Sequence, residues 1–141
     1  MSRAHARAIL IAAALLCGSG ILWLALDTWF RVPGEFGITP HPAEIWMLRL
    51  HGATAMIVLI AVGSVLPNHV RVYWNSRRNR RAGLALLGFV AALIVTGYLL
   101  YYLGDEYVRP LIATVHWLAG LVVIAVFFWH RTVGRRHTTT R

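Results

Sequence analysis

The sequence predicts an all-α integral membrane protein built as a bundle of four transmembrane helices. Hydrophobic residues make up 58% of the 141-residue chain and charged residues only 13%, which is too apolar for an ordinary soluble domain of this length. The apolar residues gather in four continuous stretches of about 20 residues, the length that a helix needs to cross a bilayer. These stretches lack the alternating pattern of membrane barrel strands, so we expect helices.

The four apolar stretches belong to one membrane domain that covers residues 1–141. We expect the helices at residues 8–26, 45–66, 82–103 and 110–129. The first stretch has the basic start and apolar centre of a signal peptide, but its near-bilayer length and its lack of a clear A-x-A site favour a retained helix. Prolines and glycines fill the loop between the first two helices, which predicts no regular structure there.

The basic residues are all arginines, and they are distributed unevenly among the loops. A formal net charge of +9 is compatible with a nucleic-acid-binding protein, but most arginines lie between or beyond the apolar stretches. They occupy the N-terminal tail, the loop after the second helix and the C-terminal tail at 130–141, whereas the acidic residues lie in or beside the other two loops. By the positive-inside rule both termini are cytoplasmic, and we expect lipid rather than nucleic acid as the partner of the arginines.

Two of the seven histidines lie at matching depths inside the expected helices. His51 and His116 each follow the outer start of their helix by about six residues, which places both rings about 9 Å below the outer boundary. A polar ring at that depth is costly unless it pairs or binds something, so it indicates a functional site. Two imidazoles on facing helices are what a six-coordinate haem iron requires. The pair predicts haem ligation, ahead of the alternative that both rings only hydrogen-bond within the bundle.

Neighbouring residues are candidates for the rest of such a site. Gly52 and Gly120 leave room for a flat macrocycle, and Arg49 and Arg109 near the outer boundary are placed to pair with its propionates. The single cysteine, Cys17, cannot supply the C-x-x-C-H pattern that attaches c-type haem. Any haem is therefore expected to be a non-covalent haem b.

A second pair of histidines leaves a second haem near the inner boundary open. His130 lies fourteen residues after His116, within roughly 40° of the same helix face and about 21 Å further along. His69 lies eighteen residues after His51, but Pro67 is expected to interrupt the helix just before it. Snorkelling of both inner histidines towards the headgroups explains them as well as ligation does. The remaining histidines lie in tails and loops and are expected to be solvated: His5, His41 and His137.

Several segments follow a pattern found in known membrane proteins. They are Leu50-His51-Gly52, the stretch from Gly63 to His69, Thr96-Gly97-Tyr98, Gly104-Asp105-Glu106 and His116-Trp117-Leu118-Ala119-Gly120. In these segments the chain resembles the bacterial four-helix b-type membrane cytochromes, the cytochrome b subunit class that includes those of formate dehydrogenases. The resemblance implies one or two haems held by histidine pairs, a bacterial inner-membrane location, and electron transfer between the quinone pool and a redox partner subunit or soluble cytochrome. The second helix departs from the pattern, because Val65 stands where a second histidine would follow His51.

Three functions are compatible with these residues. The first is an electron-transfer cytochrome b, either alone or as a subunit of an oxidoreductase, and the second is a non-haem anchor or assembly subunit of a larger complex. A proton or ion conductor ranks third, because no Asp or Glu accompanies the histidines in the membrane. Hydrolytic chemistry has no support, since the hydroxyl residues of the helices lack a recognisable base and orienting group: Ser19, Ser64, Thr54 and Thr96.

Overall fold

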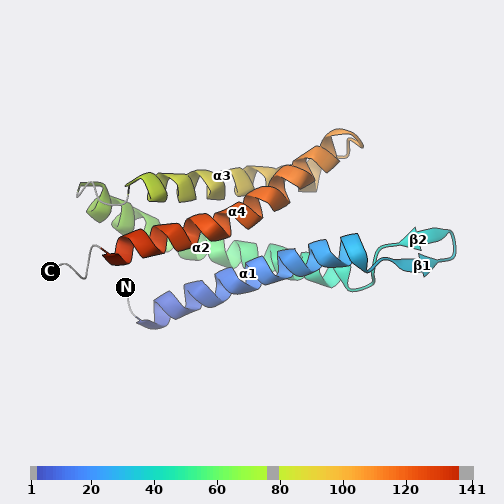
Figure 1. The fold of residues 1–141 in the computed structure, drawn as a ribbon, viewed down its shortest axis with the longest axis horizontal. Helices are drawn as coiled ribbons and strands as arrows, with labels where there is room; N and C mark the ends of the chain where they lie inside the picture. Colours follow the sequence, from blue (N-terminus) through green and yellow to red (C-terminus); the bar gives the residue numbers. More distant parts are fainter. Residues whose placement is uncertain (1–2, 76–79, 137–141) are drawn as a thin grey trace. The chain divides into compact units, whose positions relative to one another are not determined.

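The computed structural model describes residues 3–75 and 80–136, with side chains for residues 4–67 and 80–132. The described residues are mostly helical. The described residues form α1, β1, β2, α2, α3 and α4 in chain order (Figure 1). By its internal contacts the chain divides into two compact units, Met1–Asn68 and His69–Arg141.

The four helices are each long and apolar enough to cross a membrane. The qualifying segments are Ala4–Trp29, Glu44–Pro67, Arg80–Tyr102 and Val108–Thr132. Few of the described side chains are buried, and large apolar residues are exposed along all four segments. Such continuous apolar surface on a small protein marks contact with lipid or with other protein. The prediction of four membrane-length helices is confirmed, and their character indicates a multi-pass membrane protein.

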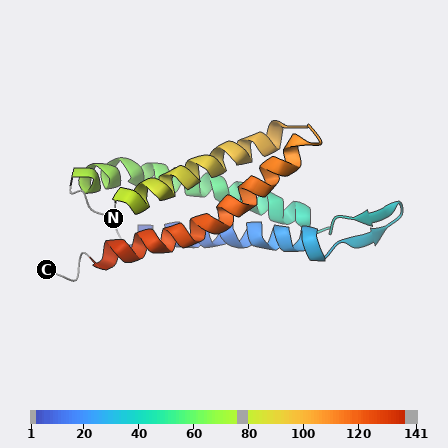
Figure 2. The same ribbon diagram turned by 45° about the horizontal axis from the view of Figure 1, so that its top comes forward.

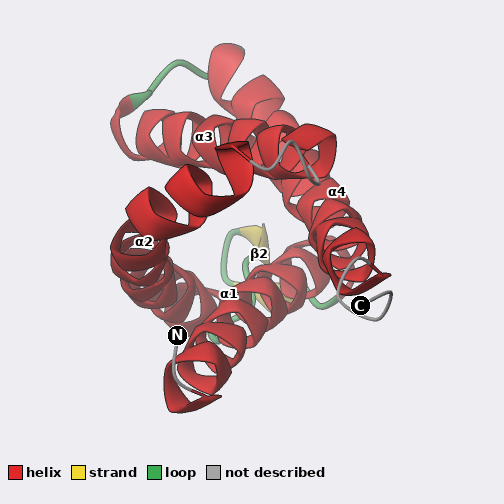
Figure 3. Ribbon diagram, turned by 90° about the vertical axis from the view of Figure 1, so that its left-hand side faces the viewer, coloured by secondary structure: helices red, strands yellow, loops and turns green. Residues whose placement is uncertain are grey.

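The first unit contains α1 (Arg3–Trp29) and the first part of α2 (Glu44–Asn75), joined by a β-hairpin. The strands are β1 (Val32–Gly34) and β2 (Gly37–Thr39), drawn in yellow in Figure 3. The hairpin corrects the expectation that this loop has no regular structure. Because the connection between the two helices is short, they run in opposite directions (Figure 1).

The hairpin tolerates its proline and glycines because of where they fall. Its antiparallel pairs are Val32↔Thr39, Pro33↔Ile38 and Gly34↔Gly37. Pairs closed by a two-residue turn alternate between hydrogen-bonded and non-hydrogen-bonded, so Pro33 occupies a position where the ladder needs no N–H. Gly37 has a φ of 124°, which a residue with a side chain rarely adopts. Both residues therefore support the hairpin, although their types alone suggested an irregular loop.

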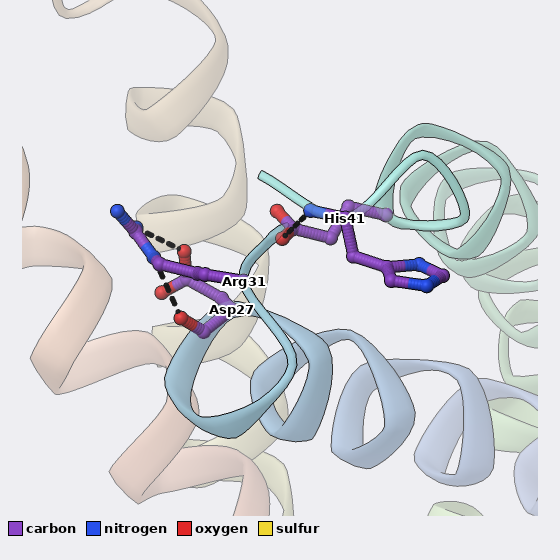
Figure 4. Close-up of polar contacts among 4 residues, drawn as sticks. Asp27, Arg31 and His41 are labelled. Atoms are coloured by element: carbon purple, nitrogen blue, oxygen red, sulfur yellow. Dashed lines mark hydrogen bonds and ion pairs between the residues drawn. The ribbon is translucent and has the colours of Figure 1, made fainter. Parts of the chain in front are cut away.

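The two helix ends that flank the hairpin are fixed by side chains. The N–H of His41 donates to Oε1 of Glu44 at 2.9 Å, and the N–H of Ala43 donates to Nδ1 of His41 at 3.1 Å. This is a capping box in which an imidazole takes the place of the usual hydroxyl. At the end of α1, Nη2 of Arg31 lies 2.6 Å from Oδ1 of Asp27 (Figure 4). His41 is thus half-buried and part of a cap, rather than solvated as expected.

The second helix continues through Pro67. The assigned helix runs to Asn75, so the interruption predicted just before His69 is not found in the backbone. The residue four positions before Pro67 is Gly63, and a side chain added there would meet nothing within 4 Å. A proline removes only one helical hydrogen bond and bends the helix, and flanking turns often carry the helix on.

The second unit contains α3 (Arg80–Tyr102) and α4 (Val108–Arg136), which lie side by side in Figures 1 and 2. A short connection joins them, so they also run in opposite directions. The fourth helix extends well beyond its expected end at residue 129. The first part of the expected basic tail is therefore helical.

Asp105 caps the start of α4. Its Oδ1 accepts the N–H of Val108 at 2.8 Å and the N–H of Tyr107 at 2.9 Å. The N–H of Arg109 donates to the carbonyl of Asp105 at 3.0 Å, which is the first bond of the helical turn. The hydrogen bonds from Val108 and Tyr107 stabilise the carboxylate and so lower the pKa of Asp105.

We predict that Asp105→Ala lowers the thermal unfolding midpoint of the detergent-solubilised protein at neutral pH, whereas Asp105→Asn retains most of the cap. Because the pKa of Asp105 is lowered in the folded state, its contribution is present above the ordinary value of 3.8 and is lost as the pH falls through the lowered value. The difference between wild type and Asp105→Ala should accordingly shrink only in strong acid. An unchanged midpoint for Asp105→Ala at pH 7 would contradict the cap.

Candidate functional site

His51 on α2 is held against α1 by its Nδ1 atom. Nδ1 lies 3.0 Å from the carbonyl oxygen of Leu16 and 3.3 Å from Oγ of Ser19. A carbonyl oxygen can only accept, so Nδ1 is the donor and carries the ring proton. The Ser19 hydroxyl belongs to a residue that is 4% exposed, and its O–H donates a hydrogen bond to the same carbonyl at 3.0 Å. In the neutral ring the lone pair is then on Nε2.

Gly20 makes the close approach of His51 to α1 possible. A Cβ added at Gly20 would lie 2.9 Å from Cε1 and 3.1 Å from Nδ1 of His51. A methyl group at 2.9 Å would displace the imidazole, since the glycine belongs to a packed helix and cannot move independently. Gly18, two residues earlier on the same helix, has nothing within 4 Å of such a Cβ. The room is therefore specific to the position beside the histidine.

His116 on α4 meets the same kind of partner on α3. Its Nδ1 lies 2.8 Å from Oγ1 of Thr96, a side chain that is 8% exposed. The Thr96 hydroxyl also lies 2.7 Å from the carbonyl oxygen of Ala92, to which it donates. A Cβ added at Gly97, the next residue, would lie 3.3 Å from Cε1 of His116. The ring thus lies on a glycine and beside a buried hydroxyl.

His130 repeats part of this arrangement further along α4. A Cβ added at Gly83 would lie 3.6 Å from Cε1 of His130. His116 and His130 are fourteen residues apart, and so are Gly97 and Gly83. Because α3 and α4 run in opposite directions at the same rise per residue, equal spacings keep each histidine opposite one glycine. His69, its expected partner, lies outside the residues whose side chains are described.

We call Ser19-Gly20 and Thr96-Gly97 the hydroxyl–glycine sockets of His51 and His116. Each unit contains one socket, on its first helix, and one socketed histidine, on its second. The histidines lie about 11 Å and about 12 Å from the first residues of α2 and α4. Each unit therefore carries a histidine at a similar distance from the start of its helix.

The sequence did not predict the sockets. Ser19 and Thr96 stood out there as hydroxyl residues without a recognisable base, and Gly20 and Gly97 were not predicted to lie beside a histidine. The available signal was the pair of Ser/Thr-Gly dipeptides, each on the helix that precedes a histidine-bearing helix. Gly52 and Gly120 were expected to leave room for a macrocycle. Beyond its chain neighbours, a Cβ added at Gly52 would meet nothing within 4 Å, and one added at Gly120 would meet only Leu93, at 4.0 Å.

The two arginines considered for propionates lie near the starts of their helices, Arg49 in the second turn of α2 and Arg109 in the first turn of α4. Arg49 is exposed, and its guanidinium lies over the Trp46 ring at 4.9 Å from the ring centroid. A cation–π contact of this kind holds the charge near the start of α2. Arg109 is exposed in the first turn of α4.

The arrangement suits a metal that needs few protein ligands. Histidines that bind metals usually donate their second ring N–H to a carbonyl or another acceptor, which fixes the tautomer and ring orientation. Among the residues that the structure describes, no three His, Cys, Asp or Glu side chains gather in a group that could hold a metal ion. A haem iron differs from such a site, because it takes only axial ligands from the protein. His51 and His116 each offer one imidazole nitrogen, the kind of donor that a haem iron takes from a protein.

Comparisons with protein family models, with curated proteins and with solved structures gave no significant match to this chain.

We predict that Gly20→Ala destabilises the protein by about 1–3 kcal/mol, because the new methyl group forces the His51 ring away from α1. Gly18→Ala is the matched control on the same helix, and it should be neutral or slightly stabilising, since alanine favours a helix over glycine. Thermal unfolding midpoints in one detergent would measure both. Equal effects of the two substitutions would show that His51 does not pack against Gly20.

Proposed function

We propose that the protein is a membrane-embedded b-type cytochrome that transfers electrons through non-covalent haem b, with His51 and His116 as axial ligands. The observation that carries this proposal is that Nδ1 of each histidine is hydrogen-bonded to the preceding helix of its own unit. With Nδ1 as the donor, the lone pair is on Nε2, the nitrogen that would bind iron.

The cost of placing these rings in apolar helices also supports ligation. A polar group in a membrane-spanning helix must be satisfied or it destabilises the protein. Two buried hydroxyls and two glycines are used to hold Nδ1 and the ring edge of His51 and His116. Fixing Nδ1 and the ring orientation in this way is what a metal-binding histidine requires.

When bound, haem b would supply reversible one-electron transfer, and the protein would supply binding and orientation. His51 and His116 would hold the haem through Nε2, and the sockets would keep each imidazole ring from rotating. Arg49 and Arg109 carry positive charge near the starts of their helices, where carboxylate groups of a cofactor would find a partner. Gly52 and Gly120 would add no side chain beside the ligands.

A second haem near the other end of the helices would use His130 and His69. His130 lies on Gly83 much as His116 lies on Gly97, which supports a similar role for it. The evidence for this inner pair is one histidine only, so the proposal commits to the outer haem. The number of haems is decided by the measurement below.

The proposed setting is the inner membrane of a bacterium, with both termini in the cytoplasm. The arginine-rich tails and middle loop support this orientation through the positive-inside rule. The connections are short, and the described part of the chain contains no separate soluble domain. Electrons would therefore be exchanged with partners, namely quinone and a redox subunit or soluble cytochrome.

A second candidate is a non-haem anchor or assembly subunit. The hydrogen bonds of His51 with Leu16 and Ser19, and of His116 with Thr96, also favour this function, because such contacts hold helices together in membranes without any cofactor. In that case the histidines would be packing residues, and the apolar outer surfaces would contact a partner subunit.

We predict sharp b-type bands in the reduced-minus-oxidised visible spectrum of protein purified in detergent after expression with sufficient haem. His51→Ala and His116→Ala should each remove the outer haem, because each takes away one axial ligand. A pyridine haemochrome assay would give the haem content: complete loss in the variants indicates one haem, and loss of half indicates two.

His5→Ala is the control for this experiment, because His5 is an exposed residue near the start of α1 and should not alter the spectrum. A flat spectrum from well-folded, haem-supplied wild type would reject the cytochrome and favour the anchor subunit. Full haem content in both ligand variants would reject this choice of ligands.

A further inference from the structure

We propose that Thr96 is a positioning residue that fixes the tautomer of His116. Its hydroxyl oxygen accepts a hydrogen bond from Nδ1–H, so that the lone pair of the ring is held on Nε2. This inference deepens the proposed function and rests on it only for the effect at iron, since the tautomer itself can be measured without haem.

The direction of the Thr96–His116 hydrogen bond follows from the other partner of the hydroxyl. A threonine hydroxyl has one proton and two lone pairs. The carbonyl oxygen of Ala92 lies 2.7 Å from Oγ1 and can only accept. The single O–H of Thr96 therefore donates its hydrogen bond to Ala92. Towards His116, at 2.8 Å, Oγ1 then presents a lone pair and Nδ1 must be the donor.

The position of the hydroxyl is fixed by its surroundings. Thr96 lies within α3 and is 8% exposed, so water does not compete for its lone pair as it would at the surface. Gly97 lets the His116 ring approach, because no Cβ stands between the ring and the helix. Two consecutive residues thus set both the distance and the proton position.

The socket of His51 provides a built-in comparison. There Nδ1 lies 3.0 Å from the carbonyl of Leu16, whereas the Ser19 hydroxyl is the more distant partner at 3.3 Å. A backbone carbonyl remains when a side chain is truncated. The tautomer of His51 should therefore survive Ser19→Ala, whereas that of His116 should depend on the side chain of Thr96.

The tautomer has a consequence for bound iron. An acceptor on Nδ1–H raises the basicity of Nε2, and a more basic axial ligand favours the oxidised iron. Loss of the acceptor in Thr96→Val should therefore raise the reduction potential of the haem that His116 ligates. Thr96→Ser keeps the hydroxyl and should leave the potential near that of wild type.

The deciding measurement is nitrogen-15 NMR of the histidine rings in the full-length, haem-depleted chain, labelled at histidine and reconstituted in lipid nanodiscs. The His116 signals are assigned by their loss in His116→Ala. We expect wild-type His116 to carry its proton on Nδ1. In Thr96→Val we expect roughly a five-fold shift of the tautomer ratio towards Nε2–H, as removal of one hydrogen bond predicts.

Three further variants make the outcome decisive. Thr96→Ser should keep the wild-type tautomer ratio at His116, and Ser19→Ala should leave the tautomer ratio of His51 unchanged. Thr114→Val removes an exposed hydroxyl bonded to the carbonyl of Pro110 on α4, and it should change the tautomer ratio of neither ring. A wild-type His116 with its proton on Nε2, or an unchanged ratio in Thr96→Val, would overturn the inference. If no variant and no wild type binds haem, the proposed function fails while the NMR result still decides the role of Thr96.

Discussion

Much of the described structure depends on satisfying an imidazole ring within an apolar helix. A polar nitrogen in such surroundings costs free energy unless a partner accepts or donates a hydrogen bond. In the first unit the partners of His51 are a backbone carbonyl and a serine hydroxyl, and in the second unit the partner of His116 is a threonine hydroxyl. The helix that precedes each histidine-bearing helix must therefore approach the histidine closely. It must also be rotated about its own axis so that its hydroxyl and glycine face the ring.

The hydroxyl–glycine socket meets both requirements with two residues. A serine or threonine in a helix can give its proton to the carbonyl of the preceding turn, which leaves a lone pair for a neighbour. Thr54 is buried and makes the same intrahelical bonds, to the carbonyls of Leu50 and His51. The hydroxyl alone is therefore ordinary, and what distinguishes the sockets is the adjacent glycine that admits the ring.

The ends of the helices determine which residues meet. A short capped connection limits how far one helix can slide along the next. In the first unit the hairpin and the His41–Glu44 capping box define where α2 begins, and in the second unit Asp105 defines where α4 begins. Polar contacts outside the apolar segments thus set the register in which His51 reaches Ser19 and His116 reaches Thr96.

The sequence by itself determined the four apolar helices and the two unusual histidines. Both are local properties: a long apolar run has few alternatives to a helix, and a histidine within it is conspicuous. Only the tertiary structure revealed the β-hairpin, because pairing decided whether Pro33 was tolerated, and only it revealed the continuity of α2 through Pro67. It alone identified the sockets as well. Whether a glycine faces lipid, a helix or an imidazole depends on the rotation and register of two helices, and neither quantity is encoded in the residues of one helix alone.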